Sequence, residues 1–196
     1  EKKNVCCGLP HLAHGLREDF LSLAKKNIDV FEEADIVVTD CASCGATLKN
    51  YRYFFADDPV MSKRAEAFSK KVMDLTEYLV KAGYKPRQRT NAVFTYHDPC
   101  HLARGQGITK QPRELLKEAG DFVEMKEANV CCGGAGSFHV DHPDTAEKIL
   151  KKKQKNIEES GASLVVTDCP GCLIQLSKAA KASGGKFGAV HISQVI

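Results

Sequence analysis

Residues 34–41 read Ala34-Asp35-Ile36-Val37-Val38-Thr39-Asp40-Cys41, and residues 162–169 repeat them as Ala162-Ser163-Leu164-Val165-Val166-Thr167-Asp168-Cys169. Each copy contains a short β-branched run between polar residues, which is typical of a buried parallel strand. Each copy ends at the first cysteine of a C-x-x-C pair, and a helical pattern follows the pair. The repeat therefore predicts two α/β units, each with a strand that runs into a helix through two cysteines.

The cysteines follow the same repeat. A Cys-Cys-Gly triplet precedes each C-x-x-C pair at nearly the same distance, and one further cysteine precedes the second triplet. The two sets are Cys6, Cys7, Cys41 and Cys44, and Cys100, Cys131, Cys132, Cys169 and Cys172. Clustered thiolates are ligands for zinc, copper(I) and iron–sulfur centres.

The repeat also predicts the domain organisation. We expect a first repeat at residues 1–86 and a second at 87–196, each with a short parallel Rossmann-like sheet and flanking helices. The second repeat begins with a strand-like Ala92–Tyr96 before Cys100, for which the first has no counterpart. The first repeat continues past residue 76 into a helical pattern, whereas the second stops at Ile196. We therefore expect the chain to be part of a longer polypeptide.

Composition narrows the functional class. The 196 residues are 43% hydrophobic and 27% charged, with a net charge of +3, which does not favour nucleic-acid binding. The basic run Lys151-Lys152-Lys153 is interpreted as a solvated helix face. No apolar stretch approaches the roughly 20 residues of a membrane span. An odd number of cysteines, some adjacent, is a poor disulfide framework, so a cytoplasmic metal or redox role is expected.

The placement of the cysteines favours a metal centre. A C-x-x-C pair at a helix start meets unpaired N–H groups and the positive end of the helix dipole, which stabilise thiolates. Adjacent cysteines fit one small tetrahedral ion poorly and a larger cluster more easily. An iron–sulfur cluster is the favoured interpretation, while zinc and redox dithiols remain open.

These residues resemble the CCG-domain, or cysteine-rich domain, iron–sulfur family. The family pattern is one Cys, then Cys-Cys-Gly, then C-x-x-C; the second repeat has it whole, and the first lacks the leading Cys. Segments His97–Leu102, Gln111–Leu116, Cys131–Phe138 and Thr167–Cys172 are most similar to the iron–sulfur subunit of glycolate oxidase and D-lactate dehydrogenase. The B-type subunit of heterodisulfide reductase is a further relative.

The resemblance implies that all nine cysteines bind metal, with a [4Fe-4S] cluster, cubane or non-cubane, in the complete second site. The incomplete first site is open to a cluster, a partial cluster, zinc or no metal. It further implies an electron-relay subunit of a flavin-dependent 2-hydroxy-acid dehydrogenase or oxidase. The implied partners are an FAD-containing subunit, an upstream ferredoxin-like domain in the full-length chain, and quinone or another acceptor. The implied location is the cytoplasm or the inner face of the membrane.

Two other functions are consistent with the same residues. One is a disulfide reductase similar to the B-type subunit of heterodisulfide reductase, in which the cluster itself is the active site. The other is a scaffold module whose fold is stabilised by structural zinc.

Overall fold

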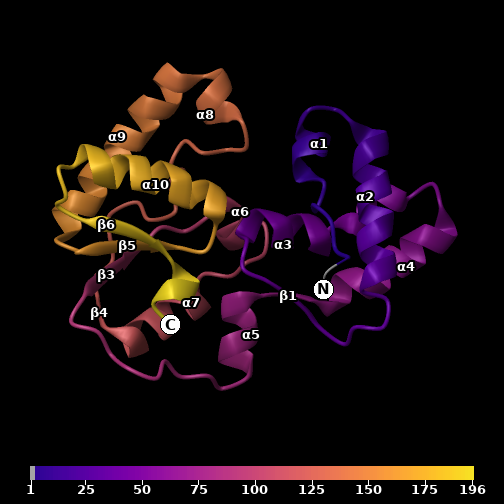
Figure 1. Cartoon of the computed structure of the whole chain (residues 1–196), viewed down its shortest axis with the longest axis horizontal. Coiled ribbons are helices and arrows are strands. Elements are labelled where there is room, and N and C mark those ends of the chain that lie inside the picture. The colour runs from indigo at the N-terminus through magenta and orange to yellow at the C-terminus, as the bar shows by residue number, and fades with distance from the viewer. Residues whose placement is uncertain (1–2) are drawn as a thin grey trace. The chain divides into compact units, whose positions relative to one another are not determined.

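The computed structural model describes residues 3–196, so Glu1 and Lys2 of the expected first repeat lie outside the described residues. The chain folds as two compact units, of which the first ends at Leu75 and the second comprises Thr76–Ile196 (Figure 1). The expected repeat boundary between residues 86 and 87 remains a prediction. Each unit is α/β with parallel strands and flanking helices, as the sequence predicts.

The first unit has a two-stranded parallel sheet of β1 (Val37–Thr39) and β2 (Val72–Asp74), paired from Val37 with Val72 to Thr39 with Asp74. Its helices are α1 (Leu9–Ala13), α2 (Arg17–Val30), α3 (Ala42–Lys49), the 3₁₀ helix η1 (Tyr51–Phe55) and α4 (Pro59–Lys71). The core is aromatic. Phe20 meets Tyr51 edge-on at 5.8 Å between centroids, and Tyr51 stacks on Phe68 at 5.6 Å.

The second unit has a four-stranded parallel sheet in the order β4-β3-β5-β6. Its strands are β3 (Val93–Tyr96), β4 (Asp121–Phe122), β5 (Leu164–Thr167) and β6 (Gly188–His191). Its helices are α6 (Cys100–Ala103), α7 (Lys110–Ala119), α8 (Phe138–Asp141), α9 (Pro143–Ser160), α10 (Pro170–Ala182) and the 3₁₀ helix η2 (Ile192–Gln194). Helix α5 (Leu75–Lys81) begins at the junction of the two units, before residues 84–92, which form neither helix nor strand.

Strand order in the second unit creates a site at one sheet edge. The chain leaves β3 toward β4 on one side and leaves β5 toward β6 on the other, although β3 and β5 are neighbours. Right-handed crossovers then place α7 on one face and α9 and α10 on the other, an arrangement visible in Figure 1. Chains that diverge from neighbouring strands leave a crevice at their carboxyl ends, the usual site position in open parallel sheets. Cys100 follows β3 and Cys169 follows β5, so both lie at this switch point.

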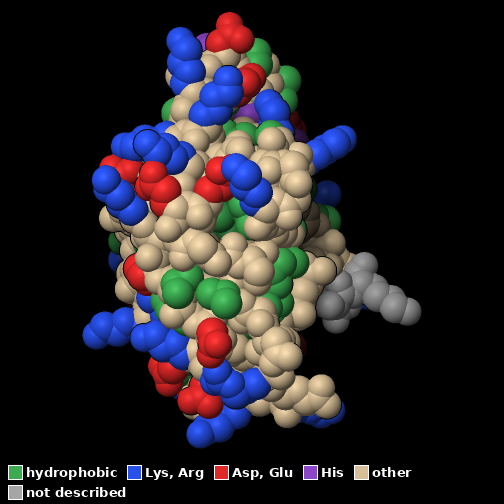
Figure 2. Space-filling model, turned by 90° about the vertical axis from the view of Figure 1, so that its left-hand side faces the viewer, with side chains coloured by type: hydrophobic (Ala, Val, Ile, Leu, Met, Phe, Trp, Pro, Cys, Tyr) green, Lys and Arg blue, Asp and Glu red, His purple; other side chains and the backbone are tan. Residues whose placement is uncertain are grey.

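Helix α9 contains the basic run, and one lysine of that run is buried instead of solvated. The helix begins with Pro143 and ends before Gly161, whose φ of 71° makes it a left-handed C-cap. Lys151 and Lys155 are exposed and pair with Glu147 and Glu159. The expectation of a solvated face is wrong for Lys153, which is only 1% exposed because it points into the second unit. Lys and Arg side chains are interspersed with Asp and Glu on the face that Figure 2 presents.

Within residues 3–196, no helix is both long enough and apolar enough to cross a membrane.

Candidate metal centre

Both C-x-x-C pairs lie at the start of a helix that directly follows a strand, as predicted. Cys41 is the N-cap of α3 and Cys169 is the N-cap of α10, and both have extended backbone conformations. The second cysteine of each pair, Cys44 or Cys172, follows in the first turn. The first-turn N–H groups of a helix have no partner within it, so they and the helix dipole favour negative charge on these sulfurs.

In the second unit the structure brings the Cys-Cys pair to the C-x-x-C pair. The Cys132 thiol makes hydrogen bonds with Cys131 and Cys172, and Cys172 makes a further one with Cys169. His97 joins the group, because one ligand atom each from His97, Cys132 and Cys172 lies within 4.8 Å of the others. Cys100 is close enough for its charge to affect Cys131. Four thiols, one imidazole and a fifth nearby thiol therefore gather at the switch point.

The electrostatics favour a thiolate at the centre of this group. Hydrogen bonds from Cys131 and Cys172 hold the pKa of Cys132 well below its usual range, although burial opposes the shift and Cys132 is only 1% exposed. The pKa of Cys172 moves the other way, because it donates to Cys132 and lies beside Cys169. One buried thiolate shared by neighbouring thiols is the charge state expected of a soft metal site.

The first unit contains the same arrangement in the same chain order. Cys7 makes hydrogen bonds with Cys44 and Cys6, and Cys44 makes a further one with Cys41. Mainly through the bond from Cys44, the pKa of Cys7 falls to about 6 from 9.0, while that of Cys44 is raised. Cys7 thus corresponds to Cys132, and Cys44 to Cys172.

The glycine after each Cys-Cys pair fixes the turn. Gly8 and Gly133 have φ values of 86° and 84°, and their N–H groups donate to the sulfurs of Cys6 at 3.4 Å and Cys131 at 3.3 Å. At Gly133 an added Cβ would lie 2.8 Å from the Ala146 carbonyl oxygen, which is backbone and has little room to shift. Glycine is required at this position by both the left-handed φ and the close approach of α9.

Buried polar side chains hold the Cys-Cys segment of the first unit. Asn27 accepts a hydrogen bond from the Val5 N–H at 3.1 Å and donates to the Cys6 carbonyl at 3.1 Å. The Tyr51 hydroxyl donates to the Cys7 carbonyl at 2.8 Å and accepts from Asn27 at 3.2 Å. The backbone of both adjacent cysteines is therefore fixed from α2 and η1.

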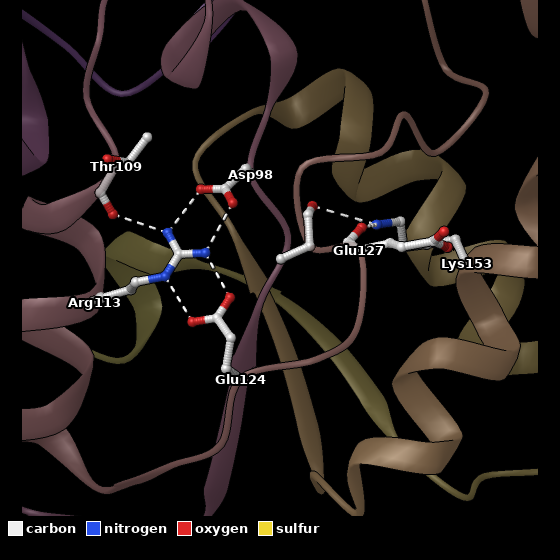
Figure 3. A network of polar contacts seen from close by, with 7 residues as sticks. Asp98, Thr109, Arg113, Glu124, Glu127 and Lys153 are labelled. Atoms are coloured by element: carbon white, nitrogen blue, oxygen red, sulfur yellow. Dashed lines mark hydrogen bonds and ion pairs between the residues drawn. The ribbon is translucent and has the colours of Figure 1, made fainter.

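An arginine clamp holds the loop that leads to Cys100 (Figure 3). The Arg113 guanidinium donates to both carboxylate oxygens of Asp98 at 2.8 Å, to both of Glu124 at 2.7 and 2.6 Å, and to the Thr109 carbonyl at 2.8 Å. These contacts occupy all five donors of the side chain. The bonds to Asp98 and then Glu124 raise the pKa of Arg113 above its already high value, so the clamp stays charged.

A second set of contacts links this loop to the Cys131-Cys132 loop. The Asp98 N–H donates to the Ala128 carbonyl at 3.1 Å, and Gln175 of α10 donates to the Gly133 carbonyl at 3.2 Å. An added Cβ on Gly134 would meet the Gly171 carbonyl oxygen at 3.1 Å and the Cys132 sulfur at 3.5 Å. The segment of Gly133 and Gly134 thus lies directly against the start of α10.

The sequence predicts the two sets of cysteines, whose role as ligands stays a prediction, but it does not reveal the residues that support them: Asn27, Tyr51, Asp98, Arg113, Lys153 and Gln175. Only Asp98 and Arg113 could have been singled out from the sequence, because they belong to the segments His97–Leu102 and Gln111–Leu116 that carry the family resemblance. Lys153 lies within a run of lysines, and Asn27, Tyr51 and Gln175 lie on helices with no motif around them, so the burial of all four depends on tertiary packing.

A model of the cysteine-rich domain (CCG) matches residues 1–49 and 94–177. The chain is 36% identical to the probable glycolate oxidase iron-sulfur subunit of Bacillus subtilis, over 99% of this chain and 46% of that protein. It is 35% identical to lactate utilization protein A of Shouchella clausii, over 100% of this chain and 83% of the relative. It is 33% identical to a fumarate reductase (CoM/CoB) subunit of Methanothermobacter marburgensis, over 98% of this chain and 37% of that protein. The chain thus spans about half of the first relative, and it belongs to the CCG cysteine-rich domain family.

Proposed function

We propose that this protein is an iron–sulfur electron-transfer subunit of a flavin-dependent dehydrogenase or oxidase that acts on a 2-hydroxy acid, glycolate or lactate. The observation that carries the proposal is the gathering of the second-unit thiols around the buried Cys132 sulfur at the sheet's switch point. The names of two relatives, a glycolate oxidase iron-sulfur subunit and a lactate utilization protein, support the substrate class.

The proposed ligands of a [4Fe-4S] cluster in the second unit are Cys100, Cys131, Cys132, Cys169 and Cys172, and those of the first site are Cys6, Cys7, Cys41 and Cys44. The donors fit such a cluster, because they are soft thiols and two of them are adjacent. When bound, the cluster accepts and releases single electrons. Cys132 and Cys169 would hold it from buried positions, and the Gly133 N–H, which donates to the Cys131 sulfur at 3.3 Å, would tune the charge on that sulfur.

The partners are proposed from the resemblance. An FAD-containing subunit would oxidise the 2-hydroxy acid, and the electrons would pass through an upstream ferredoxin-like domain and this chain to quinone or another acceptor. The chain covers only 46% of the glycolate oxidase subunit. We propose a cytoplasmic location, either free or at the inner face of the membrane.

We also propose that the two units are copies of one Rossmann-like module. The same four-cysteine order, the same glycine turn and the same strand-to-helix junction support this. For the first site we propose zinc or a partial cluster as the alternatives to a [4Fe-4S] cluster.

The test is anaerobic isolation followed by analysis of iron, zinc and acid-labile sulfide per chain and an electron paramagnetic resonance spectrum. We expect Cys172→Ser to remove the cluster of the second unit. The matched control is Cys44→Ser, at the equivalent position of the first unit, which should leave that cluster's spectrum intact. Absence of sulfide after reconstitution with iron and sulfide would contradict the proposal, and turnover of a disulfide with a reduced dye would favour a disulfide reductase.

Zinc is a second candidate because His97, Cys132 and Cys172 lie close enough together to bind one ion, and Cys169 adjoins Cys172. One nitrogen and three sulfur ligands would complete a tetrahedral structural site. His97→Ala separates the candidates. Loss of stoichiometric zinc would indicate the zinc site, whereas a cluster held by five cysteines should keep its iron.

A further inference from the structure

Lys153 is a buried cation beside the candidate centre of the second unit. It is 1% exposed, whereas the side chains of its neighbours Lys151 and Lys152 are 72% and 60% exposed. Its ammonium donates to the Glu127 carbonyl at 2.6 Å and to the Ala128 carbonyl at 3.3 Å. Figure 3 shows it reaching this loop from α9, in the same view as the Arg113 clamp.

A buried ammonium is costly, so its surroundings must favour the charge. Burial lowers the pKa of Lys153 from 10.5 to about 8, and the nearby charges of Cys132, Asp98, Glu127 and Cys131 oppose that shift. The charge of Lys153 therefore survives at neutral pH and lies within the field of the cysteine group.

The carbonyls that Lys153 binds connect two cysteine loops. Ala128 also accepts the N–H of Asp98, two residues before Cys100, and Ala128 itself stands three residues before Cys131. One ammonium thus anchors the point where the loop after β3 meets the loop after β4.

We propose that Lys153 is a positioning residue for the metal centre of the second unit: it fixes the loops of Cys100 and Cys131 and supplies a buried positive charge that favours the reduced, more negative cluster. This inference rests on the proposed function, because it requires a redox-active cluster at these cysteines. The step concerned is a one-electron reduction. The cluster gains an electron from an external low-potential reductant such as dithionite, and Lys153 neither gains nor loses a bond.

The experiment uses the full chain, reconstituted anaerobically with iron and sulfide, in four variants. Lys153→Met removes the charge and the hydrogen bonds, Lys153→Gln removes the charge but keeps an N–H donor, and Lys153→Arg keeps the charge. Lys151→Met is the matched control, because it makes the same change two residues away on the exposed face of α9. Each variant is titrated with dithionite while the cluster is followed by electron paramagnetic resonance.

We expect Lys153→Met and Lys153→Gln to lower the equilibrium constant for cluster reduction at least tenfold, a negative shift of about 59 mV for one electron. Lys153→Arg should stay much nearer to the unmodified protein, and Lys151→Met should not differ from it. Lys153→Gln keeps the test valid if Lys153→Met does not fold.

Equal potentials in the unmodified, Lys153→Met and Lys153→Gln proteins, at equal iron and sulfide content, would overturn the charge role. Full cluster occupancy in Lys153→Met, which removes the hydrogen bonds to the Glu127 and Ala128 carbonyls, would overturn the loop-fixing role. Absence of iron and sulfide from the unmodified protein would instead refute the proposed function, so the two failures are distinguishable.

Discussion

Single buried polar groups fix the backbone around both Cys-Cys pairs. In the first unit, Tyr51 and Asn27 satisfy the carbonyls of Cys7 and Cys6, and in the second Lys153 binds the carbonyls that lead to Cys131. A turn with two adjacent cysteines leaves backbone groups that neither helix nor sheet can pair. Side chains from neighbouring helices supply those partners, because a buried carbonyl without one is costly.

Tyr51→Phe should destabilise the first unit by about 1–3 kcal/mol, the usual cost of leaving a buried polar group unpaired. The change keeps the stacked ring and removes only the hydroxyl, so the Cys7 carbonyl and Asn27 each lose a partner. Urea unfolding of the metal-free protein measures the loss.

The control for this prediction is Tyr53→Phe. Tyr53 lies in the same 3₁₀ helix but is 61% exposed, and its hydroxyl accepts a hydrogen bond from the exposed Arg52. We expect its free energy of unfolding to stay within about 0.5 kcal/mol of the unmodified protein. Equal stability of the two variants would show that the Cys7 carbonyl does not need Tyr51.

Lys153 should make the stability of the metal-free protein depend on pH in the alkaline range. Below pH 8 both folded and unfolded states hold the proton of Lys153; between about 8 and 10.5 only the unfolded state keeps it. Because the unfolded state then binds more protons, this residue makes stability rise with pH, by about 3 kcal/mol over the interval. The measurement is urea unfolding at several pH values, compared with Lys153→Met, in which this contribution to the slope should be absent and the cysteine contributions retained.

At the scale of elements, the ends of strands and the starts of helices decide where the cysteines lie. Helix α7, on the opposite face of the sheet from α9 and α10, holds the loop that leads to Cys100. Arg113 on α7 binds Asp98 after β3 and Glu124 after β4. The clamp therefore ties together the loops of two neighbouring strands, and its loss should free the segment that carries Cys100.

Arg113→Met should destabilise the second unit by about 3–5 kcal/mol, because Asp98 is 5% exposed and would remain as a buried charge without its main partner. We also expect less iron per chain after reconstitution. Urea unfolding and iron analysis of the same preparation test both effects.

Arg89→Met serves as the comparison for the clamp. Arg89 pairs with Asp121, with side chains 57% and 77% exposed, and such pairs contribute at most about 1 kcal/mol. If Arg89→Met proved as damaging as Arg113→Met, the burial of Asp98 would not be the cause.

Much of the element-level arrangement could be predicted from the repeat. The runs at residues 36–38 and 164–166 predict β1 and β5 to within a residue, and the C-x-x-C pairs correctly predict the starts of α3 and α10. Lys153 could not be predicted, because it lies in a run of lysines whose other members are exposed. Only the packing of α9 against the loop at Glu127 distinguishes it, and that contact joins residues 26 positions apart. Arg113 and Asp98 likewise meet only once α7 has packed beside β3.

At the scale of the whole molecule, the contacts described for the cysteines of each compact unit come from residues of that same unit. The first-unit thiols and their supports, Asn27 and Tyr51, all precede residue 75, and the second-unit thiols and their supports all follow residue 76. Each site should therefore assemble independently of the other.

Independent assembly predicts additive effects when both sites are altered. Cys132→Ser should abolish the cluster signal of the second unit, because it removes the central thiolate, and Cys7→Ser should leave that signal and its reduction potential unchanged. Since the supporting residues named for each site belong to its own unit, the double variant should lose the sum of the iron lost by each single variant. Iron analysis and electron paramagnetic resonance of the three proteins test this. A second-unit potential that shifts in Cys7→Ser would mean that the two centres are coupled in the folded chain.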